Sequence, residues 1–316
     1  IFFPFFDSDG EDDQARLESS LLSNVGSKLA FTTDSFVVDP LEFPGGDIGN
    51  LAVCGTVNDL AVGGAQPLWL SASFIIEEGF SKALLLKIVT SMRQSATEAG
   101  VKIVTGDTKV VERGKADKLF ITTAGVGVIP PGLDLSARKV RQGDLIVVNG
   151  YLGDHGATVL TARDQFSLRS DLQTDCKPLN HLMNMVLEVC PNVRCARDAT
   201  RGGLSSVLNE IALSSKTRLL IDERLVKLRP EVRGICEILG LDPLYLANEG
   251  ALVLFVPKEE IDKVLRAMKS IPAGAESVVI GEVIELDSKP RVEMRTELGG
   301  TRIVDMLLGE QLPRIC

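Results

Sequence analysis

Residues 46–76 read GDIGNLAVCGTVNDLAVGGAQPLWLSASFII, and this segment organises the first half of the chain. The part up to residue 64 is rich in Gly and Ala, which is typical of a helix that packs closely against its neighbours. From Pro67 onward the side chains become apolar, aromatic and β-branched, as expected for a buried strand. The segment therefore predicts a close-packed helix followed by a strand.

The flanking sequence continues this alternation. Residues 29–38 (LAFTTDSFVV) predict a strand, and residues 81–100 predict a helix that Ser81 caps and Gly100 ends. The apolar residues of that helix recur with the spacing of one buried face. Further strands are expected at 101–105, 118–129, 144–148, 218–221, 251–256 and 277–286, the last being the final one, and further helices at 155–164, 179–189, 230–239 and 257–268, with another beginning at Gly203.

This order of elements predicts an α/β (α+β) protein of two domains. The sequence Pro130-Pro131-Gly132 interrupts the chain, so the domains are expected at residues 1–130 and 131–309. Residues 310–316 contain Pro313, which predicts an extended, unpacked tail that ends in Cys316. At ~3.4 Å per residue, such a tail sweeps on the order of 24 Å.

Composition narrows the class of function. The net charge of -9 disfavours a nucleic-acid partner, because phosphate backbones bind clustered Lys and Arg. No apolar run approaches the roughly 20 residues that span a bilayer, so no membrane association is predicted. The six cysteines lack the two-residue spacing of zinc and redox motifs, which is typical of reduced thiols in a cytoplasmic protein.

Four aspartates lie in or beside apolar segments: Asp34, Asp59, Asp107 and Asp198. Burying a carboxylate is unfavourable unless a cation or hydrogen-bond donors meet it. Several converging aspartates suit Mg²⁺, which prefers oxygen ligands and is usually shared with substrate phosphates. Each aspartate could equally cap a helix or a turn, and both interpretations stay open at this point.

Three other polar residues could carry chemistry. Lys109 could stabilise a phosphate charge, and Glu249 could act as a general base. His155 is expected at a helix N-terminus, where an anion can be held. From the sequence pattern alone, Lys109 and Glu249 are better explained as ordinary surface ions, and His155 could equally be a capping or packing histidine.

Taken together, the motifs closely resemble the HypE family of hydrogenase maturation proteins. The match runs in order over nearly the whole chain, through FTTDSFVVDPLEFPGGDIG (31–49), CGTVNDLAVGGAQP (54–67), IVTGDTKVVERG (103–114), GDHGAT (153–158), RDATRGGL (197–204), ANEG (247–250) and PRIC (313–316). The related AIR synthetases and selenophosphate synthetases share the aspartate motifs but not the PRIC ending.

The resemblance implies a two-domain fold of the AIR-synthetase type, with a first domain that dimerises through its sheet. It also implies ATP and Mg²⁺ as cofactors, bound between the domains at the dimer interface. HypE-like proteins accept a carbamoyl group from the carbamoyltransferase HypF on a C-terminal cysteine. They then dehydrate it with ATP to a thiocyanate, and the cyano group passes to iron held by the HypC–HypD complex.

The resemblance also assigns residues position by position. Cys316 corresponds to the carbamoyl acceptor, and Lys109 and Glu249 correspond to residues of the dehydration step. The implied contacts with ATP and its phosphates are Asp34, Asn58, Asp59, Asp107, Thr108, His155 and Asp198. The implied Mg²⁺ ligands are Asp34, Asp59, Asp107 and Asp13.

Two alternatives remain beside this hypothesis. The chain could be an ATP-dependent kinase or synthetase for a small free substrate, or a nucleotide-binding interaction module whose cysteine only anchors the fold. The sequence begins at Ile1, which indicates a longer protein, and the family's N-terminal glycine-rich segment does not occur in it. Because that segment is expected to cover the triphosphate, weakened ATP binding is also predicted.

Overall fold

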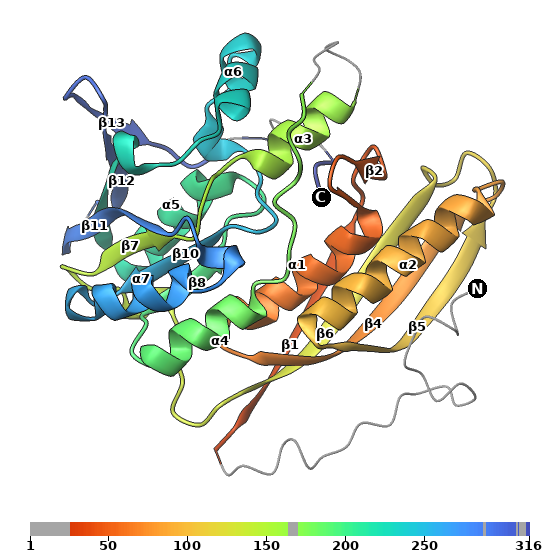
Figure 1. The fold of residues 1–316 in the computed structure, drawn as a ribbon, viewed down its shortest axis with the longest axis horizontal. Coiled ribbons are helices and arrows are strands. Elements are labelled where there is room, and N and C mark those ends of the chain that lie inside the picture. The colour runs from red at the N-terminus through yellow and green to blue at the C-terminus, as the bar shows by residue number, and fades with distance from the viewer. Residues whose placement is uncertain (1–25, 164–169, 287–288, 308, 310–313) are drawn as a thin grey trace.

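The computed structural model describes residues 26–163, 170–286, 289–307, 309 and 314–316. Within these residues the chain forms a four-stranded sheet and a seven-stranded sheet, joined by helices that pack between and around them (Figure 1). The strands of the first sheet all lie within residues 28–129, and those of the second within residues 145–304. The mixed α/β fold class is confirmed.

The strands are β1 (Lys28–Phe36), β2 (Glu42–Phe43), β3 (Gly46–Asp47), β4 (Gln66–Glu77), β5 (Lys102–Val111), β6 (Leu119–Ile129), β7 (Leu145–Val148), β8 (Cys195–Asp198), β9 (Thr217–Asp222), β10 (Leu252–Val256), β11 (Val278–Leu286), β12 (Arg291–Arg295) and β13 (Thr301–Val304). The α-helices are α1 (Ile48–Val62), α2 (Lys82–Ala99), α3 (Asp154–Ala162), α4 (Asn180–Val189), α5 (Gly203–Ser215), α6 (Pro230–Leu239) and α7 (Ile261–Lys269).

Helix α1 is buried on nearly all sides, as the small residues of its sequence predict. A Cβ atom at Gly49 would lie 2.4 Å from the Ile88 carbonyl oxygen of α2. At Gly55 it would lie 2.9 Å from the Phe36 ring of β1. Only glycine permits these approaches, so the Gly-rich sequence allows α1 to pack against α2 and the first sheet at once.

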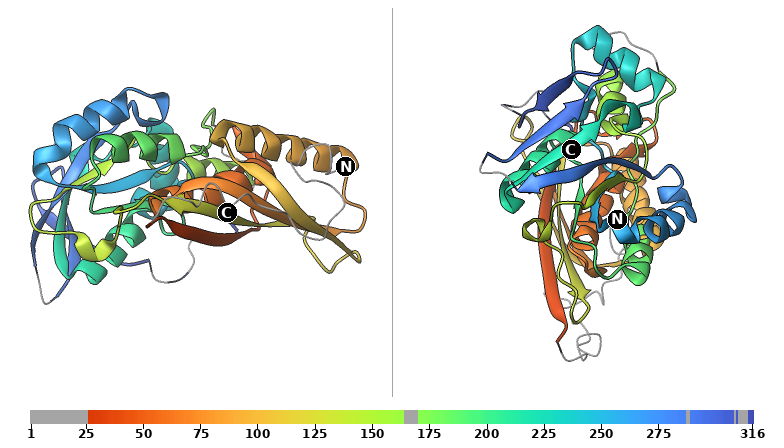
Figure 2. Two further views of the ribbon diagram at one scale, coloured as in Figure 1. Left: turned by 90° about the horizontal axis from the view of Figure 1, so that it is seen from below. Right: turned by 90° about the vertical axis from the view of Figure 1, so that its left-hand side faces the viewer.

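The first sheet has the order β1-β6-β4-β5, and α1 and α2 cover one of its faces (Figure 2). The predicted caps of α2 are confirmed. The Ser81 side chain accepts a hydrogen bond from the Leu84 N–H at 3.3 Å, and Gly100 adopts a left-handed φ of 71°. Strand β5 extends to Val111, beyond the expected residues 101–105, because it pairs along β4 despite its polar sequence.

The second sheet has the order β13-β12-β9-β11-β7-β10-β8. Helices α4 and α7 pack on one side of it through a shared apolar cluster. Helix α5 packs on the other side through a second cluster. The expectation that residues 277–286 form the final strand was wrong, since β12 and β13 follow it. Strand β8 was also missed, because four residues are too few to show a period. Among the described residues, no helix is both long and apolar enough to cross a membrane.

Candidate active site

Two predicted aspartates meet where α1 crosses β1. Asp34 accepts a hydrogen bond from the Thr56 hydroxyl at 3.3 Å, and Asp59 accepts one from the Thr32 hydroxyl at 2.8 Å. Burial, with the nearby negative charge of Asp59, raises the pKa of Asp34 to about 6. The two carboxylates therefore repel each other in a partly desolvated setting, which a proton or a cation would relieve.

Asp198 joins this pair from the second sheet. It lies at the end of β8 and is only 8% exposed. Burial, followed by the negative charges of Asp59 and Asp34, raises its pKa to about 7. The site thus combines carboxylates from both sheets, and perturbed carboxylates of this kind are typical of functional sites.

Glu249 lies in the turn before β10, next to the same group of acids. Its side chain is 3% exposed, and its Oε1 atom has no hydrogen-bond partner among the described residues. Burial raises its pKa well above the usual range, and the charges of Asp175 and Asp198 raise it further. Asp175 also fixes the turn, because its carboxylate accepts hydrogen bonds from the Glu249 and Gly250 N–H groups at 3.0 Å each.

Asn58 connects α1 to this turn. Its amide nitrogen donates to the Lys177 and Glu249 carbonyl oxygens at 3.1 and 3.2 Å, and its amide oxygen accepts from the Leu179 N–H at 2.7 Å. With these bonds made and the residue 1% exposed, Asn58 cannot contact ATP in this conformation. Asn58 instead holds the backbone of Glu249 against α1.

Asp107, Thr108 and Lys109 lie on the edge strand β5 and are exposed. The Lys109 ammonium and the Asp107 carboxylate form an ion pair at 2.9 Å. Both side chains remain more than half exposed, at 69% and 59%. These residues are therefore accessible, but they are not buried beside the acids of α1 and β1.

The sheet register separates Asp107 from Asp34. Asp34 pairs with Thr123, Thr123 with Ala72, and Ala72 with Gly106, so this row crosses the whole sheet. Three strand spacings of about 4.8 Å place Gly106 roughly 14 Å from Asp34. Asp107 is the next residue and points to the opposite face. Within one chain, Asp107 therefore does not lie beside Asp34, and a magnesium site that includes both stays a prediction, since ATP is expected at the dimer interface.

The remaining acids still suit a magnesium ion that is shared with phosphates. Among the described residues, no three His, Cys, Asp or Glu side chains converge into a complete ion site. Mg²⁺ usually takes only one or two carboxylates and completes its shell with phosphate oxygens and water. Asp34 and Asp59, with their mutual repulsion, fit that arrangement. Asp13 lies outside the described residues.

His155 lies in the first turn of α3, as predicted, but it is fully buried. Its Nε2 atom lies 2.8 Å from the Ile315 carbonyl oxygen, and its Nδ1 atom lies 2.8 Å from the Thr174 hydroxyl. The edge of the ring contacts Phe43, with a centroid distance of 5.4 Å. Because both nitrogens are bonded within the chain, the predicted phosphate contact does not exist in this conformation.

The end of the chain is docked, which corrects the expectation of an unpacked tail for residues 314–316. The Val37 N–H donates to the backbone oxygen of Cys316 at 3.1 Å, and the Asp39 N–H donates to the Arg314 carbonyl at 3.2 Å. Ile315 is 5% exposed and belongs to the apolar core beneath the first sheet. The sequence could not show this because the partners lie far away along the chain.

Arg163, at the end of α3, also binds the end of the chain. Its Nε atom donates to the Asp39 carbonyl at 2.8 Å, and its Nη2 atom donates to the Arg314 carbonyl at 2.7 Å. The Arg314 side chain bonds the Val37 carbonyl at 2.9 Å and pairs with Asp117. We refer to Val37, Asp39, Asp117, His155 and Arg163 as the terminal dock.

The dock lies close to the acidic cluster. Val37 follows Asp34 by three residues, so it lies about 10 Å further along an extended chain. Cys316 accepts the hydrogen bond from Val37 through its backbone oxygen, so it is held near the end of the strand that carries Asp34. Cys176 packs against the same apolar core as Cys316, and burial beside the Cys54 thiol of α1 raises the pKa of its own thiol.

Several of these residues were missed by sequence reasoning. Asp175 gave a weak signal, since an aspartate before a cysteine in a polar loop is common in turns. Arg163 and Thr174 gave no signal in the sequence, because their contacts matter only when the end of the chain is docked. Cys54 and Cys176 are 122 positions apart, and no motif connects them.

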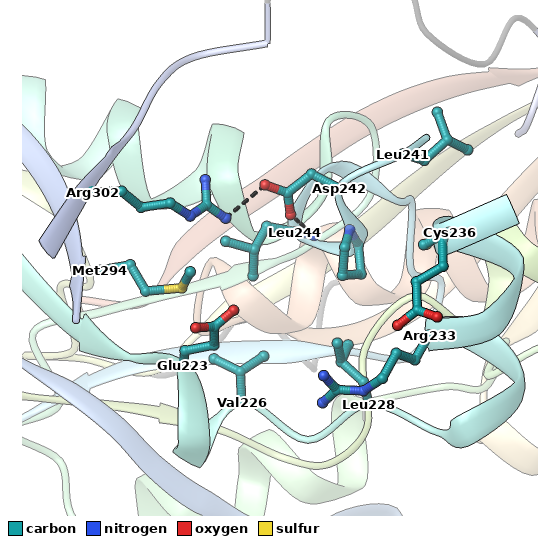
Figure 3. Close-up of a pocket in the computed structure, with 12 residues that line it drawn as sticks. Glu223, Val226, Leu228, Arg233, Cys236, Leu241, Asp242, Leu244, Met294 and Arg302 are labelled. Carbon is teal, nitrogen blue, oxygen red and sulfur yellow. Dashed lines mark hydrogen bonds and ion pairs between the residues drawn. The ribbon is translucent and has the colours of Figure 1, made fainter. Parts of the chain in front are cut away.

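A separate cavity of about 310 Å³ lies in the second half of the chain (Figure 3). Its walls include Glu223, Arg233, Leu244 and Met294, and an Arg302–Asp242 ion pair at 2.6 Å borders it. None of the predicted site residues lines this cavity. The acidic cluster and the terminal dock are therefore distinct from it.

The fold and site define a two-domain protein related to AIR synthases. Residues 11–129 match the family model for the N-terminal domain of AIR synthase related proteins, and residues 141–292 match that for the C-terminal domain. The chain is 60% identical to carbamoyl dehydratase HypE of Rhodobacter capsulatus over 316 residues, covering 100% of this chain and 93% of that protein. The chain belongs to the HypE carbamoyl dehydratase family.

Two crystal structures are also closely similar. One is the hydrogenase maturation protein HypE in complex with ATP, with a TM-score of 0.93 and 45% identity over 100% of this chain and 94% of that chain. The other is a HypE–HypF complex, with a TM-score of 0.85 and 45% identity over 88% of this chain and 90% of that chain. The AIR-synthetase-type fold implied by the sequence is confirmed.

Proposed function

We propose that the chain dehydrates a carbamoyl group carried on the Cys316 thiol, using ATP, and so supplies the cyanide ligand for [NiFe]-hydrogenase iron. The observation that carries this proposal is the docking of Cys316 beside Val37, near the acids of β1 and α1. The family's printed activity and its ATP-bound relative support the reaction class. The reaction converts a thiocarboxamide to a thiocyanate and removes the elements of one water.

When bound, ATP supplies a phosphoryl group that makes the amide oxygen a good leaving group. Asp34 and Asp59 would hold Mg²⁺ against the phosphates and reduce repulsion between them. Asp198 completes the acidic wall from the second sheet. Carboxylates with raised pKa values are suited to binding Mg²⁺, because the cation supplies the positive charge that stabilises their ionised form.

Glu249 would accept a proton from the amide nitrogen. Its buried, partly unbonded carboxylate becomes a strong base once it is ionised, since the surrounding negative charges favour protonation. A cation held by the neighbouring aspartates lowers that pKa and allows ionisation before the reaction. Asn58 and Asp175 position the base through its backbone.

Binding of Mg²⁺–ATP should weaken as the pH falls. The pKa values of Asp34 and Asp198 are about 6 and about 7, above the usual value, so both carboxyls take up protons between pH 8 and pH 5.5. Because protons then compete with the cation, calorimetry should give a Kd about tenfold or more larger near pH 5.5 than near pH 8.

Asp59→Asn provides the matched control for this titration. The nucleotide's own phosphate titrates equally with both proteins, so any difference comes from the site. The variant should bind more weakly near pH 8 and show a smaller change with pH, since burial still raises the Asp34 pKa but the charge of Asp59, which raises it further, has been removed. An identical pH dependence in the two proteins would show that these carboxylates do not hold the cation.

The chain is also proposed to form a homodimer through the face of the first sheet opposite α1 and α2. That face exposes Leu29, Phe31 and Ile75 by 60%, 72% and 45% of their surfaces. Leu29 and Phe31 are neighbours on this face and Ile75 lies further along it, and apolar residues exposed on one face of a sheet make that face a candidate interaction surface. Asp107 and Lys109 lie on the same face, so a partner chain is the proposed route by which they reach bound ATP.

Phe31→Glu should disrupt this dimer, because it places a charge in an apolar interface. Sedimentation velocity should then give one chain mass of 34.0 kDa in place of twice that value. Glu112→Gln, an exposed change just beyond β5, should leave the mass unchanged. A Phe31→Glu protein that sediments like the unsubstituted chain would refute this interface.

Partners follow from the same proposal. HypF, which is present in the HypE–HypF structure, would supply the carbamoyl group, and the HypC–HypD complex would receive the cyano group. The reaction would take place in the cytoplasm. The docked chain end also fits the interaction-module alternative, in which Cys316 only anchors the fold, and the Cys316 substitution described below separates the two.

A further inference from the structure

The cavity in the second half of the chain is enclosed by several separate elements (Figure 3). Its wall is formed by the 3-10 helices η3 (Glu223–Leu225) and η4 (Pro243–Tyr245) or the residues beside them, together with α6, β12 and β13. The volume of about 310 Å³ is near the lower limit for ligand pockets in proteins. At ~30 Å³ per water molecule it equals about ten waters, so the cavity suits a small ligand.

The inner wall of the cavity is apolar. Seven of its twelve lining side chains are apolar or carry sulfur. Among them, Val226, Cys236, Leu244 and Met294 are each at most 7% exposed. Val226, Leu244 and Met294 also belong to the apolar cluster of the second sheet, which holds them in place. This wall can therefore bind the hydrocarbon part of a ligand without rearranging.

Two of the five charged lining residues neutralise each other. Arg302 and Asp242 form an ion pair at 2.6 Å, and the Asp242 carboxylate also accepts a hydrogen bond from the Leu244 N–H at 3.0 Å. Because its partners lie on β13 and in η4, this pair fixes those two elements beside each other. The selection of a ligand is left to the other three charged residues.

Those three residues are Glu223, Arg233 and Glu237, and none of them forms an ion pair with another described residue. The Glu223 Oε2 atom accepts from the Glu297 N–H at 2.9 Å, which leaves Oε1 for a ligand. Figure 3 shows the Glu223 carboxylate and the Arg233 guanidinium at the same cavity, one from η3 and the other from α6. The cavity thus offers a carboxylate and a guanidinium above an apolar wall.

Negative charge is in excess around this space. Burial raises the pKa of the Cys236 thiol to about 11, and the negative charges of Asp242 and Glu237 contribute to the increase. With the Arg302–Asp242 pair neutral, two carboxylates remain against the single guanidinium of Arg233. A simple anion would be repelled by the carboxylates, which disfavours ATP and carbamoyl phosphate, and a simple amine would be repelled by the guanidinium. A ligand that carries both charges avoids both penalties.

We infer that this cavity binds a small zwitterion with an apolar body, of the chemical class of an aliphatic or thioether α-amino acid. The ligand's carboxylate accepts hydrogen bonds from Arg233, and its ammonium group donates to Glu223, with Glu237 adding negative charge. Its side chain packs against Leu244 and Met294. The inference goes beyond the proposed function, since no residue assigned to the reaction lines this cavity.

The binding test uses the unsubstituted chain and L-leucine as the probe, without ATP or a carbamoyl donor. Saturation-transfer NMR follows the titration and should give saturable binding with a Kd of about 1 mM or lower. Two matched probes each lack one charge: N-acetyl-leucine has no ammonium group, and leucinamide has no carboxylate. Each should bind about tenfold or more weakly, because one charged group of the cavity then loses its partner.

Two variants assign the charges to residues. Arg233→Gln should weaken leucine binding about tenfold and remove the preference for leucine over leucinamide. Glu223→Gln should weaken it similarly and remove the preference for leucine over N-acetyl-leucine. Glu231→Gln, an exposed change on α6 outside the cavity, should bind all three probes like the unsubstituted chain. Thermal melting checks that each variant is folded.

The inference is overturned by any of three results. One is the absence of saturable leucine binding up to about 10 mM. Another is binding of N-acetyl-leucine or leucinamide as tight as that of leucine, which would indicate recognition of one end of a peptide. The third is unchanged binding of all three probes in both Arg233→Gln and Glu223→Gln.

Discussion

Cys316→Ala should abolish carbamoyl transfer to the chain and reduce ATP-dependent phosphate release to background. The substitution removes the sulfur to which the carbamoyl group would be attached, so no substrate exists for the later steps. It leaves the backbone oxygen of residue 316, and hence its bond to Val37, intact. Phosphate release and intact mass, measured with HypF, carbamoyl phosphate and ATP, report the two losses.

Cys236→Ala is the matched control, since that thiol is buried in α6, in the second half of the chain. It should retain both the adduct and phosphate release. A kinase or synthetase for a small free substrate would turn over ATP equally with Cys316 or alanine. An interaction module would show no adduct in any of the three proteins, so the comparison separates all three hypotheses.

Glu249→Gln should stop the reaction after the carbamoyl group has been loaded. Glutamine has nearly the same shape and keeps the backbone bonds to Asp175 and Asn58, but it cannot accept a proton from the amide nitrogen. Loss of a positioned base typically slows such a step by ~10²–10⁴-fold. Mass spectrometry should therefore find Cys316 carbamoylated, with little or no cyanated product.

Glu98→Gln, an exposed change near the end of α2, should cyanate Cys316 at the normal rate. Normal cyanation in Glu249→Gln as well would remove Glu249 from the mechanism. Loss of loading in that variant would indicate instead that the buried carboxylate serves the docking of the chain end. Thermal melting checks that the variant is folded, because replacing a buried, repelled carboxylate is expected to stabilise the protein.

The sequence predicted elements whose signals are local. Helix α2 has an apolar stripe with Ser81 and Gly100 at its ends, and α1 has the small residues that its close packing requires. The link between Asp34 and Asp59 could also be anticipated, because both belong to motifs that lie near each other in sequence. Local spacing and capping chemistry were sufficient for these features.

The position of Asp107 could not be predicted in the same way. The register of β4 shifts against β5 at Leu70 and Ser71 and against β6 at Pro67 and Trp69. A slip of one residue moves a side chain to the other face of a sheet, so these irregularities determine where Asp107 points. They arise from pairing between strands, which the spacing of residues along one strand does not record.

The docked end depends on contacts of still longer range. The Arg314 side chain bonds the Val37 carbonyl across 277 positions, and His155 reaches Ile315 across 160. Pro313 and Gly309 favour an extended chain but do not state whether anything covers it. The PRIC motif led to the proposed function of the tail, whereas only the structure located residues 314–316.

Intact mass spectrometry of the full-length protein tests the central claim most directly. The protein is incubated with HypF, carbamoyl phosphate and ATP, and its C-terminal peptide is then sequenced. The account predicts a carbamoyl adduct on Cys316 that becomes lighter by one water only when ATP is present. An adduct on another residue, or one on Cys316 that ATP leaves unchanged, would contradict it.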